Sequence, residues 1–183
     1  GDVYAAGTAT NASGKQVATL WKNGKPQALA DGSTDSWAWF VFVSGGDVYV
    51  AGTITSGKQA AALWKNGVAQ YLTDGTASAQ AYSVFVSGGD VYVAGSVANA
   101  SGKWVATLWK NGVAQSLTDG TANARAYPVF VSGGDVYTAG NEKKDYRNAI
   151  AVLWKNGKPQ ELTDGSSEAS AYTVSVSGSD VYA

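Results

Sequence analysis

The feature that most constrains this chain is a repeat that runs through its whole length. The tripeptide Asp-Val-Tyr begins at Asp2, Asp47, Asp90, Asp135 and Asp180, at intervals of 45, 43, 45 and 45 residues. The segment Leu-Trp-Lys-Asn-Gly keeps a similar interval, with its tryptophan at positions 21, 64, 109 and 154. A fixed period of this length indicates a repeat protein, in which each copy forms one unit that stacks on its neighbours.

The first half of each copy reads as a β-hairpin. In the copy that begins at Ala81, residues 81–87 alternate in polarity and are rich in aromatic and β-branched side chains, which is typical of a strand. Gly88-Gly89 then allows the positive φ angles of a tight two-residue turn, and residues 90–95 form the returning strand. We label these strands A and B of the copy.

The second half of the copy is a second hairpin. After a polar loop, residues 104–110 form strand C, Asn111-Gly112 is a strong turn signal, and residues 113–117 form strand D. Asp119-Gly120 ends the strand, and another polar loop leads to the next copy. The sequence therefore predicts four antiparallel strands per copy.

Four antiparallel strands in 43 to 45 residues are the unit of a β-propeller blade. A helical solenoid is excluded because no stretch has a 3.6-residue apolar period, and a parallel β-helix would use shorter repeats with fewer hairpins. Strand C is apolar on both faces, bulky on one and small on the other, which suits a sheet that lies between two neighbours. We expect its tryptophan to pack over alanines of the next blade as part of the core.

The predicted architecture is all-β, a single propeller domain over residues 1–183 with four four-stranded antiparallel blades. Three blades are complete, and the terminal blade is shared between the two ends of the chain; the predicted ranges are 36–74, 79–119, 124–164, and 171–178 together with 1–31. In the shared blade, strand A over 171–177 is expected to pair with the N-terminal strand over 2–7 and so hide both sheet edges. The segment that starts at Asp180 is then surplus. It alternatively marks an excerpt of a longer array, or chains that join through their terminal strands into a larger ring.

The residues of the repeat also resemble a known group of proteins. The string AYSVFVSGGDVYVAG, followed by AxLWKNGxxQxL, is similar to the repeats of bacterial extracellular propeller-like proteins, including the HAF-type repeats. The resemblance covers the whole chain and implies an extracellular or cell-surface protein, but it implies no activity, because propellers host many functions. The copies are unusually alike, which also fits a recently amplified or engineered array.

Composition excludes several kinds of chemistry and partner. The chain has no His and no Cys, so Ser-His-Asp and Cys-His nucleophile systems are excluded and the commonest metal ligands are missing. A net charge of −1 offers no field for nucleic acid or an anionic membrane. The regular acids at the ends of the D strands each precede a glycine and are interpreted as turn residues: Asp31, Asp74, Asp119 and Asp164. We therefore expect no enzymatic activity, no metal and no cofactor.

The copies differ mainly in the B–C and D–A loops, whereas the SGGD and WKNG turns hardly change. Just before the near-constant Ala-aromatic pair of strand A, the copies carry Trp37, Gln80, Arg125 and Ser170, and the B–C loops add Trp104 and Tyr146. Strand A is innermost in a propeller, so its four variable positions are predicted to surround the mouth of the central channel, with Trp104 and Tyr146 flanking them. Free drift of loops that hold no core also accounts for such variation.

An aromatic ring, an amide and a guanidinium suit a sugar or a peptide as ligand. The sequence thus predicts a non-enzymatic binding module, with lectin-like carbohydrate binding as the first hypothesis. The alternative is a structural or engineered, self-assembling propeller scaffold with no small-molecule ligand. In either case a homo-oligomer through the terminal strands is an expected form.

Overall fold

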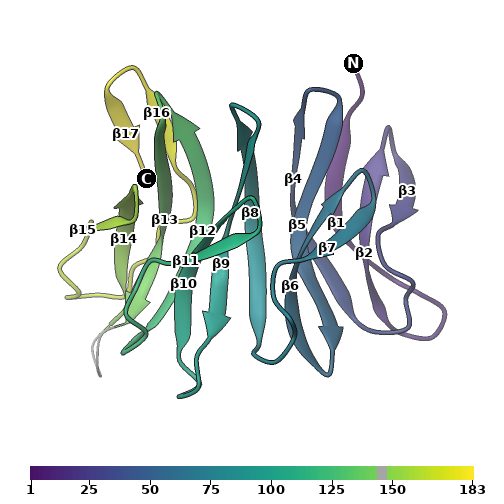
Figure 1. The fold of residues 1–183 in the computed structure, drawn as a ribbon, viewed down its shortest axis with the longest axis horizontal. Coiled ribbons are helices and arrows are strands. Elements are labelled where there is room, and N and C mark those ends of the chain that lie inside the picture. The colour runs from purple at the N-terminus through teal and green to yellow at the C-terminus, as the bar shows by residue number, and fades with distance from the viewer. Residues whose placement is uncertain (144–147) are drawn as a thin grey trace. The chain divides into compact units, whose positions relative to one another are not determined.

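A computed structural model describes residues 1–143 and 148–183, and every regular element in these ranges is a β-strand (Figure 1). The all-β class predicted from the sequence is confirmed. The chain divides into two compact units, Gly1–Val84 and Phe85–Ala183, which are described separately below. In the described ranges, no helix is present that could span a membrane.

The first unit contains two antiparallel sheets. The smaller sheet has the order β1-β2-β3, from Tyr4–Thr10, Gln16–Lys22 and Lys25–Ala28. The larger sheet has the order β4-β5-β6-β7, from Ser36–Ser44, Asp47–Ser56, Lys58–Lys65 and Val68–Tyr71. The larger sheet contains strands A to D of one copy in sequence order, and it matches the blade predicted over 36–74.

The second unit contains one four-stranded sheet, most of another and a hairpin. The first sheet, of order β11-β10-β9-β8, is formed by Val113–Ser116, Trp104–Lys110, Asp90–Ala98 and Ala79–Ser87, of which β8 begins in the first unit. The second sheet, of order β12-β13-β14-β15, is formed by Asn123–Ser132, Asp135–Lys143, Ile150–Lys155 and Lys158–Glu161. These match the blades predicted over 79–119 and 124–164.

The tight turns form as the sequence predicts. In the Asn-Gly turns the asparagines take positive φ angles of 50° to 51°, and the following glycines are also positive. Both glycines of each Gly-Gly pair are positive as well, for example Gly88 at 59° and Gly89 at 86°. Two successive positive φ values are those of a type I′ turn, whose twist matches that of the strands it joins.

The C-terminal segment differs from the prediction. A strand was expected over 171–177, paired with the N-terminal strand, but β16 covers only Ser175–Ser177 and pairs antiparallel with β17, Asp180–Tyr182. The segment at Asp180 is therefore not surplus: it is strand B of a further A–B hairpin. The reason is local, because the turn at Gly178, with a φ of 61°, brings the two short strands together. The sheet of β1 has three strands, so the shared terminal blade is not found.

Two of the A strands, β4 and β12, are interrupted by a bulge close to the loop end of their sheets. The register of β4 against β5 shifts between Ala38 and Phe40, and that of β12 against β13 shifts between Ala126 and Val129. A bulge leaves residues unpaired and re-aims their side chains. The aromatic residue of the Ala-aromatic pair, Trp39 in β4 and Tyr127 in β12, falls within this irregularity.

The sheets of each unit pack face to face through the tryptophan of strand C. In the first unit, Trp64 from β6 lies in one buried cluster with Ala18 and Leu20 from β2. In the second, Trp154 from β14 lies with Ala106 and Leu108 from β10. These contacts confirm the predicted stacking of tryptophan over alanine. Trp64, Trp109 and Trp154 are fully buried, whereas Trp21 of the N-terminal sheet is half-buried.

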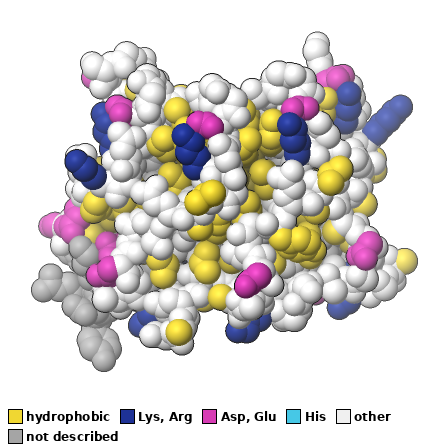
Figure 2. Space-filling model, viewed as in Figure 1, with side chains coloured by type: hydrophobic (Ala, Val, Ile, Leu, Met, Phe, Trp, Pro, Cys, Tyr) yellow, Lys and Arg dark blue, Asp and Glu magenta, His cyan; other side chains and the backbone are white. Residues whose placement is uncertain are grey.

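A polar bracket joins the two hairpin turns of each sheet and explains why their sequences hardly vary. Asp47 at the start of β5 accepts a hydrogen bond from Asn66 Nδ2 at 2.7 Å and pairs with Lys65 Nζ at 2.8 Å. Asn66 Oδ1 in turn accepts from the Val48 backbone N–H, and the Lys65 ammonium lies over the Tyr49 ring. The same bracket forms at Asp2, Asp90 and Asp135. Figure 2 shows such Lys and Asp side chains lying side by side.

Candidate functional site

The variable residues of the second unit meet at the loop end of its sheets. Arg125, near the start of β12, is the Cα partner of Asn141 in β13, and Trp104 is the first residue of β10. Ser170 lies in the segment between β15 and β16. Three of the six residues predicted from the sequence, Trp104, Arg125 and Ser170, are thus brought into one region.

Trp104 and Arg125 are in direct contact. The Arg125 guanidinium lies 5.3 Å from the centre of the Trp104 ring, which is the distance of a cation–π pair. The backbone N–H of Trp104 donates to Asn123 Oδ1 at 2.9 Å, and this bond holds the start of β10 against the start of β12. Both side chains are half-buried, so they are ordered by these contacts and still reach solvent.

Asn141 connects this pair to Ser170 and to an aromatic pair. Its Nδ2 donates to Ser170 Oγ at 2.7 Å and to the Tyr127 hydroxyl at 3.4 Å. The rings of Tyr127 and Tyr172 lie 5.0 Å apart at a tilt of 34°. Tyr172 is 72% exposed, so one of its faces is open to a ligand.

A cavity of about 390 Å³ lies among these residues. Its walls include the indole of Trp104, the amides of Asn123 and Asn141, and the charged side chains of Arg125, Lys143 and Glu168. This volume is within the range of small-ligand pockets. Amides offer both donors and acceptors, whereas the guanidinium offers donors in a planar fork, so the lining can match several hydroxyl groups at once.

The variable residues of the first unit have different environments. Gln80 in β8 donates from Nε2 to Gln59 Oε1 at 2.9 Å and accepts from the Tyr82 hydroxyl. Trp37 in β4 is half-buried and is the Cα partner of Thr53. Trp39 and Phe40, which follow it, are 48% and 43% exposed. Tyr146, the remaining predicted residue, lies outside the described residues.

Sequence reasoning missed Asn141, Tyr127 and Tyr172. It searched for positions that vary, and the aromatic residue of strand A hardly varies among the copies. Asn141 was counted only as the first residue of a loop, whereas β13 extends through it to Lys143. The sequence did offer one signal for Asn141, its side-chain type. The corresponding residues of the other copies are Thr8, Thr53 and Ser96, and these lack an amide.

The regular aspartates of the D–A loops are turn residues, as predicted. Asp31 Oδ1 accepts from the backbone N–H of Ser33 at 2.9 Å and from its hydroxyl at 2.7 Å, and these bonds lower the pKa of Asp31. Asp74 makes the same two bonds with Thr76, whose hydroxyl and backbone N–H lower the pKa of that carboxyl. Among the described residues, no group of three or more His, Cys, Asp or Glu side chains is placed to hold a metal ion.

Comparison with known proteins gives similarity in structure alone. No protein-family model and no curated protein sequence matches the chain. Among solved structures, a protein assigned as TolB from Agrobacterium tumefaciens is similar, with 15% identity and a TM-score of 0.62 over 87% of this chain and 61% of that one. The β-propeller domain of the Trilobed protease from Pyrococcus furiosus, described as having an open velcro topology, has 13% identity and a TM-score of 0.54 over 90% of this chain and 52% of that one.

A third similar structure is the acylaminoacyl peptidase of Pyrococcus horikoshii, with 15% identity and a TM-score of 0.53 over 90% of this chain. The chain spans 61%, 26% and 52% of the lengths of the TolB, acylaminoacyl peptidase and Trilobed protease chains. Together with the four-stranded antiparallel sheets, this likeness shows a β-propeller fold. At such identities it carries the fold and no function.

Proposed function

We propose that the chain is a non-enzymatic binding module whose second unit holds a carbohydrate at the cavity between Trp104, Arg125 and Asn141. The observation that carries the proposal is the convergence of an indole, a guanidinium and two amides on one cavity of about 390 Å³. Trp37 and Gln80 belong to the first unit, and their place at the same mouth stays a prediction.

The chemistry of the lining favours a sugar over a simple apolar ligand. The cation–π contact with Arg125 occupies the Trp104 ring on one side, so the indole offers a sugar its remaining surface. Asn141 uses Nδ2 on Ser170 and Tyr127 but keeps acceptor capacity on Oδ1, since an amide oxygen has two lone pairs. Tyr172, whose exposed ring packs on Tyr127, does not line this cavity.

Three further points belong to the same proposal. A non-enzymatic role is supported by a sequence without His or Cys. Four blades per chain are supported by the period of the repeat, and an extracellular or cell-surface location by the resemblance to extracellular propeller repeats. Carbohydrate or peptide is the expected partner, with no nucleic acid and no membrane.

The test replaces one contacting pair of residues by the equivalent pair of another copy of the repeat. In the first unit, Gln59 and Gln80 occupy the positions of Trp104 and Arg125 and bond to each other. The double variant Trp104→Gln and Arg125→Gln therefore removes the indole and the guanidinium while keeping a compatible contact. We expect a glycan array to lose the signals of the glycans bound at this cavity, with an affinity for them at least about tenfold weaker by calorimetry and an unchanged melting temperature. Identical glycan profiles of the wild type and the double variant would refute the proposal.

The second candidate is a self-assembling scaffold without a small ligand, and one observation favours it. The strands β1 and β17 each pair with one neighbour, β2 and β16, so each has an edge at which a further strand can add. Exposed sheet edges are templates for pairing with another chain. The native mass decides this point: a value near 18.8 kDa excludes a stable homo-oligomer, and a multiple of it supports one.

A further inference from the structure

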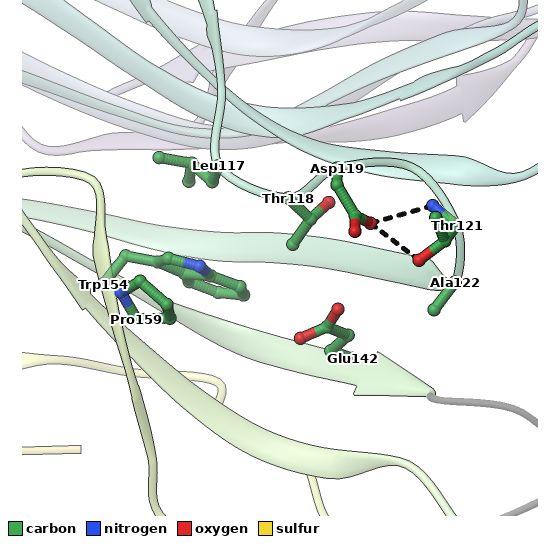
Figure 3. A pocket seen from close by; sticks show the side chains of 8 residues that line it. All are labelled: Leu117, Thr118, Asp119, Thr121, Ala122, Glu142, Trp154 and Pro159. Atoms are coloured by element: carbon green, nitrogen blue, oxygen red, sulfur yellow. Dashed lines mark hydrogen bonds between the residues drawn. The ribbon is translucent and has the colours of Figure 1, made fainter.

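A second cavity in the second unit has polar atoms that the fold leaves without partners. It has a volume of about 480 Å³ and lies between the loop after β11 and the strands β13 and β14 (Figure 3). Trp154 and Pro159 lie on one side, Thr118 and Asp119 lie across from them, and the side chain of Glu142 projects between (Figure 3).

Two of these atoms are buried hydrogen-bonding groups with no partner among the residues that the structure describes. Trp154 is fully buried, and its Nε1 donor is unpaired. The hydroxyl oxygen of Thr118 is also buried and unpaired. A buried donor without an acceptor is costly, so two of them in the wall of one cavity point to a ligand that satisfies them.

The first unit contains the equivalent groove, which serves as an internal comparison. There Trp64 Nε1 donates to the Leu29 carbonyl at 2.7 Å, so the corresponding indole is satisfied by the protein. Ala30 stands where the second unit has Thr118, and Ile54 stands where it has Glu142. Glu142 is thus the lining residue that distinguishes this cavity, because a threonine also stands at positions 73 and 163 and Trp109 Nε1 is also buried and unpaired among the described residues.

The other copies also show that the Thr118 hydroxyl departs from the usual arrangement. Thr73 Oγ1 accepts from the Ala61 backbone N–H at 3.2 Å, and Thr163 Oγ1 accepts from the Ala151 N–H at 3.1 Å. Thr118 occupies the same place in its copy, and its hydroxyl makes no such bond. It is therefore a buried hydroxyl of a residue in the cavity wall that no described residue bonds.

The geometry points to a binding site for a small polyhydroxyl ligand, such as one sugar ring, in the cavity of Trp154, Thr118, Asp119 and Glu142. A ligand hydroxyl can accept from the Trp154 N–H and donate to a carboxylate or to Thr118. An ammonium cannot accept from the indole, and a carboxylate or phosphate would face two acidic side chains. Asp119 Oδ1 accepts two bonds from Thr121, and a carboxylate has about four lone-pair sites.

This site does not depend on the proposed site at Trp104. The direct readout is the indole N–H resonance of Trp154 in the ¹⁵N-labelled full chain, assigned with Trp154→Phe. Glucose, galactose, mannose and xylose are titrated in turn, with acetamide as a probe for a peptide-like ligand. The Trp64 indole, already bonded to Leu29, is the control within the same spectrum.

We expect at least one sugar to shift the Trp154 resonance saturably and to leave that of Trp64 unchanged. Thr118→Val removes one hydroxyl that bonds to no described residue, so the fold is retained and the affinity falls about fivefold or more. The double variant of Trp104 and Arg125 keeps the shift, which separates this site from the loop-end cavity. The inference is overturned if no sugar shifts Trp154, if Thr118→Val binds as the wild type does, or if acetamide alone gives the saturable shift.

Discussion

Gly52 is the position where one added methyl group has the best-defined cost. A Cβ atom at Gly52 would lie inside the contact distance of the Trp37 carbonyl oxygen and 2.8 Å from Cζ3 of Trp64. The carbonyl belongs to strand A next to its bulge, and Trp64 is fully buried in the core of the first unit. Neither neighbour can move without breaking the ladder or the packing of the sheets.

Overpacking of a well-packed core costs about 1–3 kcal/mol, and a clash with backbone belongs at or above the upper end of that range. We therefore expect Gly52→Ala to lower the free energy of unfolding by about 3 kcal/mol or more. For a chain of this length that is a fall of about 6–12 °C in melting temperature. Denaturant titrations followed by tryptophan fluorescence and by circular dichroism measure it.

Gly7 provides the matched control. It is the corresponding glycine of β1, whose sheet has no strand A, and its added Cβ meets only the Trp21 ring, at 3.2 Å for the nearest atom. Gly7→Ala should cost less than about 1 kcal/mol. A Gly52→Ala protein as stable as the wild type would refute the steric argument. A Gly7→Ala protein as unstable as Gly52→Ala would show that a strand covers β1 in solution.

Two further predictions concern single interactions. Trp64→Phe loses the hydrogen bond from Nε1 to the Leu29 carbonyl, whereas Trp154→Phe has no such bond to lose. Chemical denaturation should therefore show a free energy of unfolding that falls about 1 kcal/mol further for Trp64→Phe than for Trp154→Phe. Equal losses of unfolding free energy in the two variants would contradict this reasoning. The contacts with Lys65 and Asn66 hold the pKa of Asp47 below its ordinary value, and Lys110 and Asn111 do the same for Asp90. The ionised aspartates therefore stabilise the folded state at pH values above the ordinary carboxyl pKa. This stabilisation is lost as the pH falls through the lowered pKa values. Melting temperatures between about pH 5 and about pH 2 should therefore fall less steeply when both aspartates are replaced by Asn; unchanged slopes would contradict the bracket.

The strands and turns could be predicted because their causes are local. Alternation and β-branched content mark strands A and C, and Asn-Gly and Gly-Gly supply the positive φ angles of the turns within two residues. The buried tryptophans followed from a strand that is apolar on both faces. The C-terminal hairpin was mispredicted because the local sequence pattern identifies a strand but does not say whether that strand pairs with a near or a distant one. The turn at Gly178 favours the near one.

The site was only partly predictable, because its residues are far apart in the sequence and meet only when the strands pair and the sheets pack. Asn141 reaches Ser170 across 29 residues, and Trp154 reaches the cavity of Thr118 across 36. Variation among copies identified Arg125 and Ser170, but it could not find Tyr127, which is an aromatic residue in every copy. Nor could it find the unpaired indole of Trp154, since the sequence around Trp64 is almost the same.

The variable positions also vary in pairs, and this changes how the variation is interpreted. Gln59 contacts Gln80 and Trp104 contacts Arg125, each pair 21 residues apart, from the start of strand C to the start of the next strand A. Each member must fit its partner in the neighbouring sheet, so part of the difference between copies comes from packing and needs no ligand. What remains for a ligand is the surface that the pair leaves open, together with Asn141 and the cavity beside it. For this reason a pair swap tests ligand binding more cleanly than a single alanine, which would break the fit between sheets and remove the ligand contact at once.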